Sequence, residues 1–193
     1  MANYRNIELG SGKLGISLSG NYTLENKVLN VFNPPLVAAA GKTVFDQTDA
    51  ALVLTSRPKY KGILGFDHKI GKWGITLYNT MFGPTTFHDG DNGLDSNLNI
   101  EFQTKIVTDL GASVQLMKNL TFAANIQNLF NVIPKWKFVA LNTAGQAILD
   151  DLNQVKSETN LLTFNGKYAT MRYNGSQFSQ LGTIFSASLN LKF

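Results

Sequence analysis

The chain has 193 residues, of which 44% are hydrophobic and only 16% are charged, and its formal net charge is +4. The Lys and Arg residues are scattered and form no run, which argues against a nucleic-acid-binding surface. The absence of Cys excludes a disulfide framework, thiol catalysis and Cys-bound metals. No stretch approaches the ~18 apolar residues of a membrane helix, and the N-terminus lacks the apolar segment of a signal peptide. We therefore expect a mature form or a piece of a larger protein.

Six segments alternate between apolar and polar residues, which is the pattern of a β-strand with two different faces. The polar positions are rich in Ser, Thr, Asn and Gly, so most of the polarity is uncharged. We expect residues 2–9 to be the end of a seventh strand. The six predicted strands span residues 14–24, 60–70, 73–82, 102–116, 120–130 and 181–193.

The predicted connections alternate in length. Residues 71–72 and 117–119 form links of hairpin size, whereas residues 29–58, 83–99 and 131–180 form long loops. Short turns at one rim and long loops at the other are typical of an outer-membrane β-barrel, in which the apolar face meets lipid and the polar face lines a wet lumen. A β-sandwich has more even connections, and long structureless loops argue against an ordinary compact domain. We predict an all-β fold in which residues 1–193 form antiparallel strands of a transmembrane barrel, with long extracellular loops.

The loop at 83–99 contains the best metal candidate by composition. It brings together one histidine and three carboxylates within eight residues, but the sixth position counted from Asp89 is Leu94 and not the Gly of a calcium-binding loop. We therefore expect a solvated loop and no metal ion. The four polar residues are His88, Asp89, Asp91 and Asp95.

The last long loop has structure of its own. Residues 144–155 show helical spacing behind Thr143 as a possible N-cap. Residues 161–164 and 167–173 flank Asn165-Gly166 and predict a hairpin. Aromatic and polar residues of the long loops either touch a ligand or pack the loops together, and both interpretations stay open. These residues are Trp136, Tyr168, Arg172, Tyr173 and Phe178.

No constellation of an enzyme is present. We find no nucleophile–base pair, and two His without Cys make a catalytic zinc site unexpected. Residues 10–13 lack the spacing of a phosphate-binding loop and precede a strand, so they predict a turn. His68 lies at an apolar position near a turn and is expected to be an interfacial residue. We expect no catalytic residues and no cofactor.

The last strand has the strictest alternation, and it predicts how the whole sheet faces its surroundings. We expect one set of residues to face lipid, namely Ile75, Leu77, Leu110, Val114, Phe122, Ile126, Phe185, Leu189 and Leu191. We expect a second set to face the lumen, namely Thr76, Ser113, Gln115, Asn125, Ser186, Ser188 and Asn190.

Several short motifs follow one another in a characteristic order. They are Asp109-Leu110 at a strand entry, Lys118-Asn119-Leu120 at a turn, Asn128-Leu129-Phe130-Asn131 at a strand end, and then Pro134. With Arg57-Pro58-Lys59 and the closing strand 182–193, this order resembles the C-terminal barrel region of TonB-dependent outer-membrane receptors. The resemblance covers roughly residues 57–193 and is strongest over 101–136 and 178–193. The use of Lys, Asn and Phe is similar to that of Bacteroidota proteins.

The resemblance implies a function in the outer membrane. It implies a barrel of about 22 strands with an upstream plug, of which this chain supplies the C-terminal wall, the loops and the closing strand. The receptors import ferric siderophores or similar scarce nutrients. The implied partners are outer-membrane lipid, the remaining strands and plug in the same or a separate chain, TonB through the plug, and the assembly machinery. That machinery would read the C-terminal strand through Phe185, Leu189, Leu191 and Phe193.

A second interpretation comes from a different class of protein. A small self-contained structural or adhesive outer-membrane barrel of about eight strands would show the same alternation. The two interpretations differ in whether the strands of this chain close on themselves.

Overall fold

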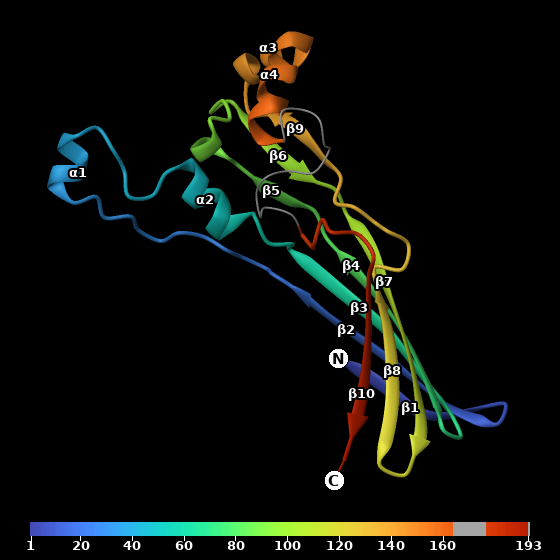
Figure 1. The fold of residues 1–193 in the computed structure, drawn as a ribbon. Coiled ribbons are helices and arrows are strands. Elements are labelled where there is room, and N and C mark those ends of the chain that lie inside the picture. The colour runs from blue at the N-terminus through green and yellow to red at the C-terminus, as the bar shows by residue number, and fades with distance from the viewer. Residues whose placement is uncertain (164–176, 193) are drawn as a thin grey trace.

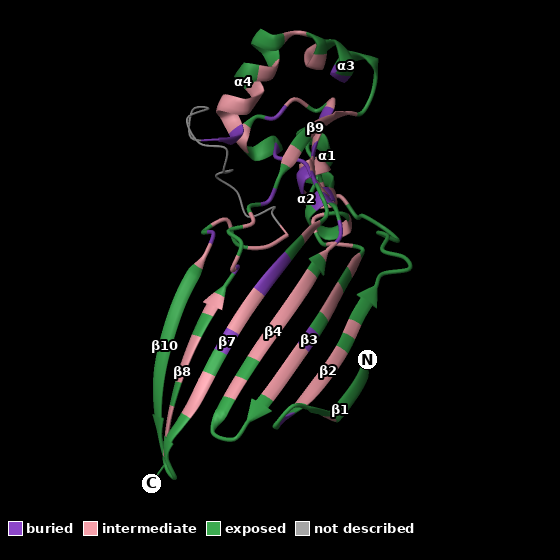
Figure 2. Ribbon diagram, turned by 90° about the vertical axis from the view of Figure 1, so that its right-hand side faces the viewer, coloured by how far each residue is buried: buried purple, intermediate pink, exposed green. Residues whose placement is uncertain are grey.

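The computed structural model of the protein describes residues 1–163 and 177–192 (Figure 1). The main element is an open antiparallel sheet of seven strands in the order β1-β2-β3-β4-β7-β8-β10. The antiparallel all-β prediction is thereby confirmed, while β1 and β10 form two separate edges in place of a closed barrel (Figure 2). The strands are β1 Ala2–Leu9, β2 Gly12–Tyr22, β3 Tyr60–Ile70, β4 Trp73–Phe82, β7 Lys105–Met117, β8 Leu120–Gln127 and β10 Ile184–Leu191.

Tight turns join the strands at one end of this sheet. Gly10 (φ 59°) and Gly71 (φ 56°) occupy the left-handed region in the β1–β2 and β3–β4 turns. A residue with a Cβ would be strained there, so Gly is the natural choice. Figure 1 shows these turns at the bottom, together with the β7–β8 turn. The predicted short link at 71–72 is therefore confirmed, the second link is residues 118–119 because Met117 ends β7, and residues 2–9 form a full strand, β1.

The predicted strand at 102–116 is wrong in its extent. Phe102 ends β6, Leu98–Phe102, which belongs to a different sheet, and β7 begins at Lys105. The chain leaves one sheet and enters the other between them: the Gln103 amide still donates to the Lys135 carbonyl, one residue beyond the β6–β9 pair of Phe102 and Trp136, whereas Lys105 already pairs with Phe82 of β4. Other boundaries are shorter than predicted: β2 ends at Tyr22, β8 at Gln127, and β10 begins at Ile184.

A small folded cap sits beyond the long-loop end of the large sheet (Figures 1 and 2). Its three-stranded sheet has the order β5-β6-β9 and pairs residues far apart in sequence, such as Ile100 with Phe138. The predicted long loop at 83–99 therefore contains regular structure, namely β5, η1 and the start of β6. The remaining elements are β5 Thr85–Phe87, β9 Trp136–Ala140, α1 Pro35–Ala39, α2 Gln47–Leu54, η1 Gly90–Asn92, α3 Thr143–Asp150 and α4 Leu152–Leu162.

The predicted helix at 144–155 is two helices. Asn142 and not Thr143 is the N-cap of α3, since its side chain accepts a hydrogen bond from the Gly145 amide. Asp151 is extended (φ −103°, ψ 108°), which ends α3 and lets its side chain cap α4. Because α4 continues to Leu162, residues 161–162 do not form a strand as predicted. Thr163 is the C-cap of α4, and the predicted hairpin from residue 164 onward lies outside the described residues.

The buried hydrophobic core lies almost entirely in the cap. Its side chains interdigitate between the small sheet and α2 and α4, with Phe87, Leu98, Ile100 and Phe102 all fully inaccessible. Figure 2 shows buried residues concentrated there, whereas the large sheet is mostly exposed or intermediate. Among the described residues, no helix has the length and apolarity needed to span a membrane.

Candidate functional site

The register of the large sheet brings apolar residues of six strands into one row. Each is the direct cross-strand partner of the next, so all point to the same face. A second row joins Ile70, Trp73, Val114, Phe122 and Leu189. The side chains of both rows are half-buried or exposed, and those on the edge strand β10 are the most exposed, with Phe185 at 73% and Leu189 at 62%. The first row runs Ile16, Phe66, Leu77, Leu110, Ile126 and Phe185.

The opposite face carries polar and small side chains in equally regular rows. One row runs Gly15, Asp67, Thr76, Gly111, Asn125 and Ser186 across the same six strands. The residues predicted to face lipid thus share one face, and those predicted to face a lumen share the other.

The polar face has a tightly packed centre in which glycine is required. Tyr78 lies directly opposite Gly65, and its hydroxyl donates a 2.9 Å hydrogen bond to the Asp67 carboxylate. A Cβ on Gly65 would come within 2.6 Å of the Tyr78 ring and 2.5 Å of the Ser17 hydroxyl. The ring therefore covers the glycine, and the two strands are locked in register at this point.

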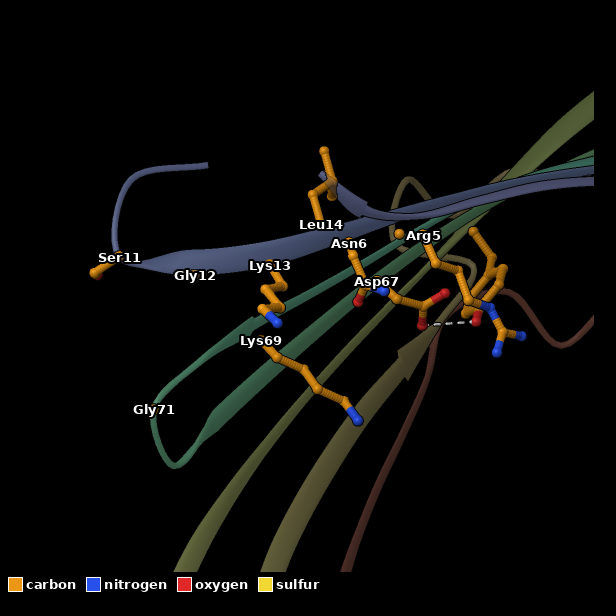
Figure 3. Close-up of a pocket in the computed structure, with 11 residues that line it drawn as sticks. Arg5, Asn6, Ser11, Gly12, Lys13, Leu14, Asp67, Lys69 and Gly71 are labelled. Atoms are coloured by element: carbon orange, nitrogen blue, oxygen red, sulfur yellow. Dashed lines mark hydrogen bonds between the residues drawn. The ribbon is translucent and has the colours of Figure 1, made fainter. Parts of the chain in front are cut away.

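Next to this centre, toward the short turns, lies an open basin of about 780 Å³ (Figure 3). Arg5, Lys13 and Lys69 line it, and Lys13 and Lys69 are direct cross-strand partners. Figure 3 shows these lysines on one side of the sheet and Leu14 on the other. The basin joins β1, β2 and β3, so sequence reasoning, which treated each strand separately, missed it.

The motif Asn128-Leu129-Phe130-Asn131 is a structural junction. Asn128 (φ 53°) and Asn131 (φ 51°) are left-handed, which ends β8. The Asn128 side chain bonds both the amide and the carbonyl of Val132, each at 2.7 Å.

The same junction connects three strands. The Asn128 amide donates to the Asp109 carboxylate in β7 at 2.8 Å, and the Thr183 hydroxyl donates to the Asn128 carbonyl at 2.7 Å just before β10. Pro134 is buried behind the turn, whereas Phe130 is 71% exposed. The motif thus positions the entry of the last strand.

The C-terminal strand is an edge in the described structure. β10 pairs with β8 along its whole length, and its other side has no partner strand among residues 1–163 and 177–192. Phe185, Leu189 and Leu191 alternate along it on the apolar face. Phe193, the fourth residue predicted to be read during assembly, lies outside the described residues.

The acidic loop at 88–95 differs from the prediction. His88 and Asp89 are 3% and 1% exposed, so this part is not solvated. His88 Nδ1 lies 2.9 Å from the Leu98 carbonyl, and the Asp89 carboxylate accepts bonds from the side chain of Asn92. Both residues thus support the cap. No metal-binding group of three His, Cys, Asp or Glu is found within the described ranges.

The remaining predicted positions have structural roles where they are described. His68 stands on the apolar face opposite Leu14 and Ile75, as expected. Trp136 packs edge-on against Phe138 at 5.3 Å between ring centroids, and Phe178 lies 5.2 Å from Phe82. The Trp136 contact lies within β9, and the Phe178 contact joins the segment before β10 to the end of β4, so both interpretations of these residues stay open. Tyr168, Arg172 and Tyr173 lie outside the described residues.

No family model, no curated protein and no solved structure matches the chain. The functional conclusion therefore rests on the two faces of the open sheet and on the motifs of the sequence.

Proposed function

We propose that this chain is a section of the wall of a transmembrane β-barrel in an outer membrane, and that it belongs to a transport receptor. The observation that carries the proposal is the continuous apolar face of the large sheet, from Ile16 on β2 to Phe185 on β10, which neither the cap nor a second sheet covers among the described residues. Exposed apolar surface of this extent is unfavourable in water and favourable against lipid.

Strand length supports the same proposal. β3 has 11 residues and β4 has 10, and a tilted strand needs about 9–11 residues to cross a bilayer. Trp73 lies beside the short turns, whereas Tyr22 and Tyr60 are paired at the other end. Aromatic residues at both ends of an apolar band are typical of membrane barrels.

The transport role rests on the motifs. The resemblance to TonB-dependent receptors supports energised uptake of a ferric siderophore or a similar scarce nutrient, with the plug and the remaining strands supplied outside this chain. In this proposal the polar face lines the lumen, and the cap stands at the outer rim, where it contributes to ligand capture. We propose no catalytic step.

The open sheet favours a larger barrel over the small self-contained one. In a bilayer an unpaired strand edge leaves backbone groups without hydrogen bonds, so β1 and β10 both require partner strands. A closed small barrel would pair these two strands with each other, and the described sheet does not.

The proposal is tested by spin labels, because the chain has no native Cys. Single-Cys variants at Leu77 and Val114 are labelled in lipid vesicles and compared with their neighbours Thr76 and Ser113. We expect the first two to be accessible to oxygen dissolved in lipid, and the other two to a water-soluble nickel relaxer. Equal accessibility of neighbouring positions would overturn the membrane role.

The transport step needs its own test. Under iron starvation, loss of the gene is expected to abolish growth on a ferric siderophore to the same extent as loss of TonB. Unchanged growth would contradict siderophore uptake while leaving the vesicle result untouched.

A further inference from the structure

We propose that the basin on the polar face is a docking site for an acidic polypeptide segment, recognised by Arg5, Lys13 and Lys69. This inference concerns the polar face and goes beyond the proposed membrane role of the opposite face. The segment belongs to a separate partner polypeptide of acidic composition.

The first support is the distribution of charge. The short-turn end of the sheet carries six cations, Arg5, Lys13, Lys69, Lys72, Lys118 and Lys192, against two anions, Glu8 and Asp67. This is a net charge of +4, from six minus two. The rest of the chain then has 11 cations and 11 anions, from 17 minus six and 13 minus two. The whole net charge of the protein therefore lies at this end.

The second support is that the cations of the basin have no ionic partner within residues 1–163 and 177–192. Lys13 and Lys69 stand directly opposite each other, an arrangement of like charges that destabilises a sheet. Glu8 of β1 is the cross-strand partner of Lys13 on the other flank of β2, yet the two form no ion pair. The ion pairs in the described residues are those of Lys27 with Glu25 and Lys137 with Glu101. Asp67 already accepts the Tyr78 hydroxyl. An incoming carboxylate would relieve the repulsion.

The geometry favours a polypeptide over a lipid or a small anion. A lipid headgroup here would place its tails along the polar face, next to Asn6, Ser11 and Asp67. The three cations come from three different strands and are all exposed, so they form no closed pocket around a single phosphate. An extended segment with several carboxylates matches their spread.

The test uses the 193-residue chain in a zwitterionic detergent with fluorescein-labelled oligoglutamate as the probe and oligoglutamine as the neutral control. We expect oligoglutamate alone to bind, with an affinity that falls as salt is raised. Replacing Arg5, Lys13 and Lys69 together by Gln should weaken binding about tenfold.

The matched control removes the same charge elsewhere. Lys59, Lys105 and Lys135 at the long-loop end are replaced together by Gln, which leaves both triple variants with the same net charge. We expect the control to bind oligoglutamate as the parent does. An equal loss in both variants, equal binding of oligoglutamine, or full displacement by inorganic phosphate or by anionic phospholipid micelles would overturn the proposal.

Discussion

At the scale of single residues, the centre of the polar face depends on a glycine that has no room for a side chain. The Tyr78 ring and the Ser17 hydroxyl occupy the space where a Gly65 Cβ would stand. The same contact orients the Tyr78 hydroxyl toward Asp67. Glycine usually weakens a strand, because its backbone loses more entropy on folding than that of other residues. Here the neighbouring strands can pack this closely only because Gly65 has no side chain.

Gly65→Ala is therefore expected to lower the free energy of unfolding by about 1–3 kcal/mol, the usual cost of overpacking. Gly62→Ala in the same strand is the control, because the nearest atom to its Cβ is Met81 Cε at 3.8 Å, an ordinary contact. Urea unfolding of both variants measures the difference. Equal stability of the two variants would contradict the tight contact between Gly65 and Tyr78.

At the scale of elements, the position of a residue along its strand decides how much a charge costs. Leu110 lies in the middle of β7, whereas Leu189 is two residues from the end of β10 and pairs with Phe122 near the short turn. In the proposed membrane orientation, these two residues of the same face would therefore lie at different depths.

Leu110→Lys is expected to destabilise the lipid-inserted protein by about 2–4 kcal/mol, and Leu189→Lys by only about 0–1 kcal/mol. Ser113→Lys, on the polar face of β7, should be mild. Unfolding in lipid vesicles gives the three values. A larger cost for Ser113→Lys than for Leu110→Lys would reverse the assignment of the two faces.

The helix α4 has a titratable N-cap outside the large sheet. Hydrogen bonds from the Gln154 side chain and the Asn153 amide to the Asp151 carboxylate lower its pKa below the ordinary value. A carboxylate with a lowered pKa in the folded state stabilises the fold above its unfolded pKa, about 3.9, and this contribution is lost as pH falls through the folded pKa.

Amide exchange of α4, corrected for intrinsic rates, should therefore lose protection as the pH falls below about 4. Asp151→Asn keeps an N-cap oxygen without a titrating proton. The protection of the α4 amides in this variant is therefore expected to vary less with pH than in the parent protein. The same acid response in both proteins would show that Asp151 is not the group responsible.

At the scale of the whole molecule, the two unpaired edges predict that the chain does not close on itself. A variant with one Cys in place of Ala2 on β1 and one in place of Ile184 on β10 contains no other Cys. We expect no intramolecular disulfide in it, and a native complex heavier than the 21.2 kDa of the chain. A disulfide-closed, monodisperse monomer would instead support the small-barrel interpretation.

The sequence by itself determined the strands and their faces, because period-2 alternation is a local property of the chain. It placed Leu77 and Thr76 on opposite faces, found the hairpin at residues 71–72, and predicted a long-loop end separate from a short-turn end. These features need only neighbouring residues, and the register agrees with them.

Only the tertiary structure decided which distant segments meet. The pairing of β6 with β9 turned a predicted loop into a cap and split the predicted strand at 102–116. The same packing buried His88 and Asp89, which composition alone placed in solvent. The basin likewise needs Arg5, Lys13 and Lys69 from three strands. Such contacts depend on strand order and register across long separations, which no local pattern encodes.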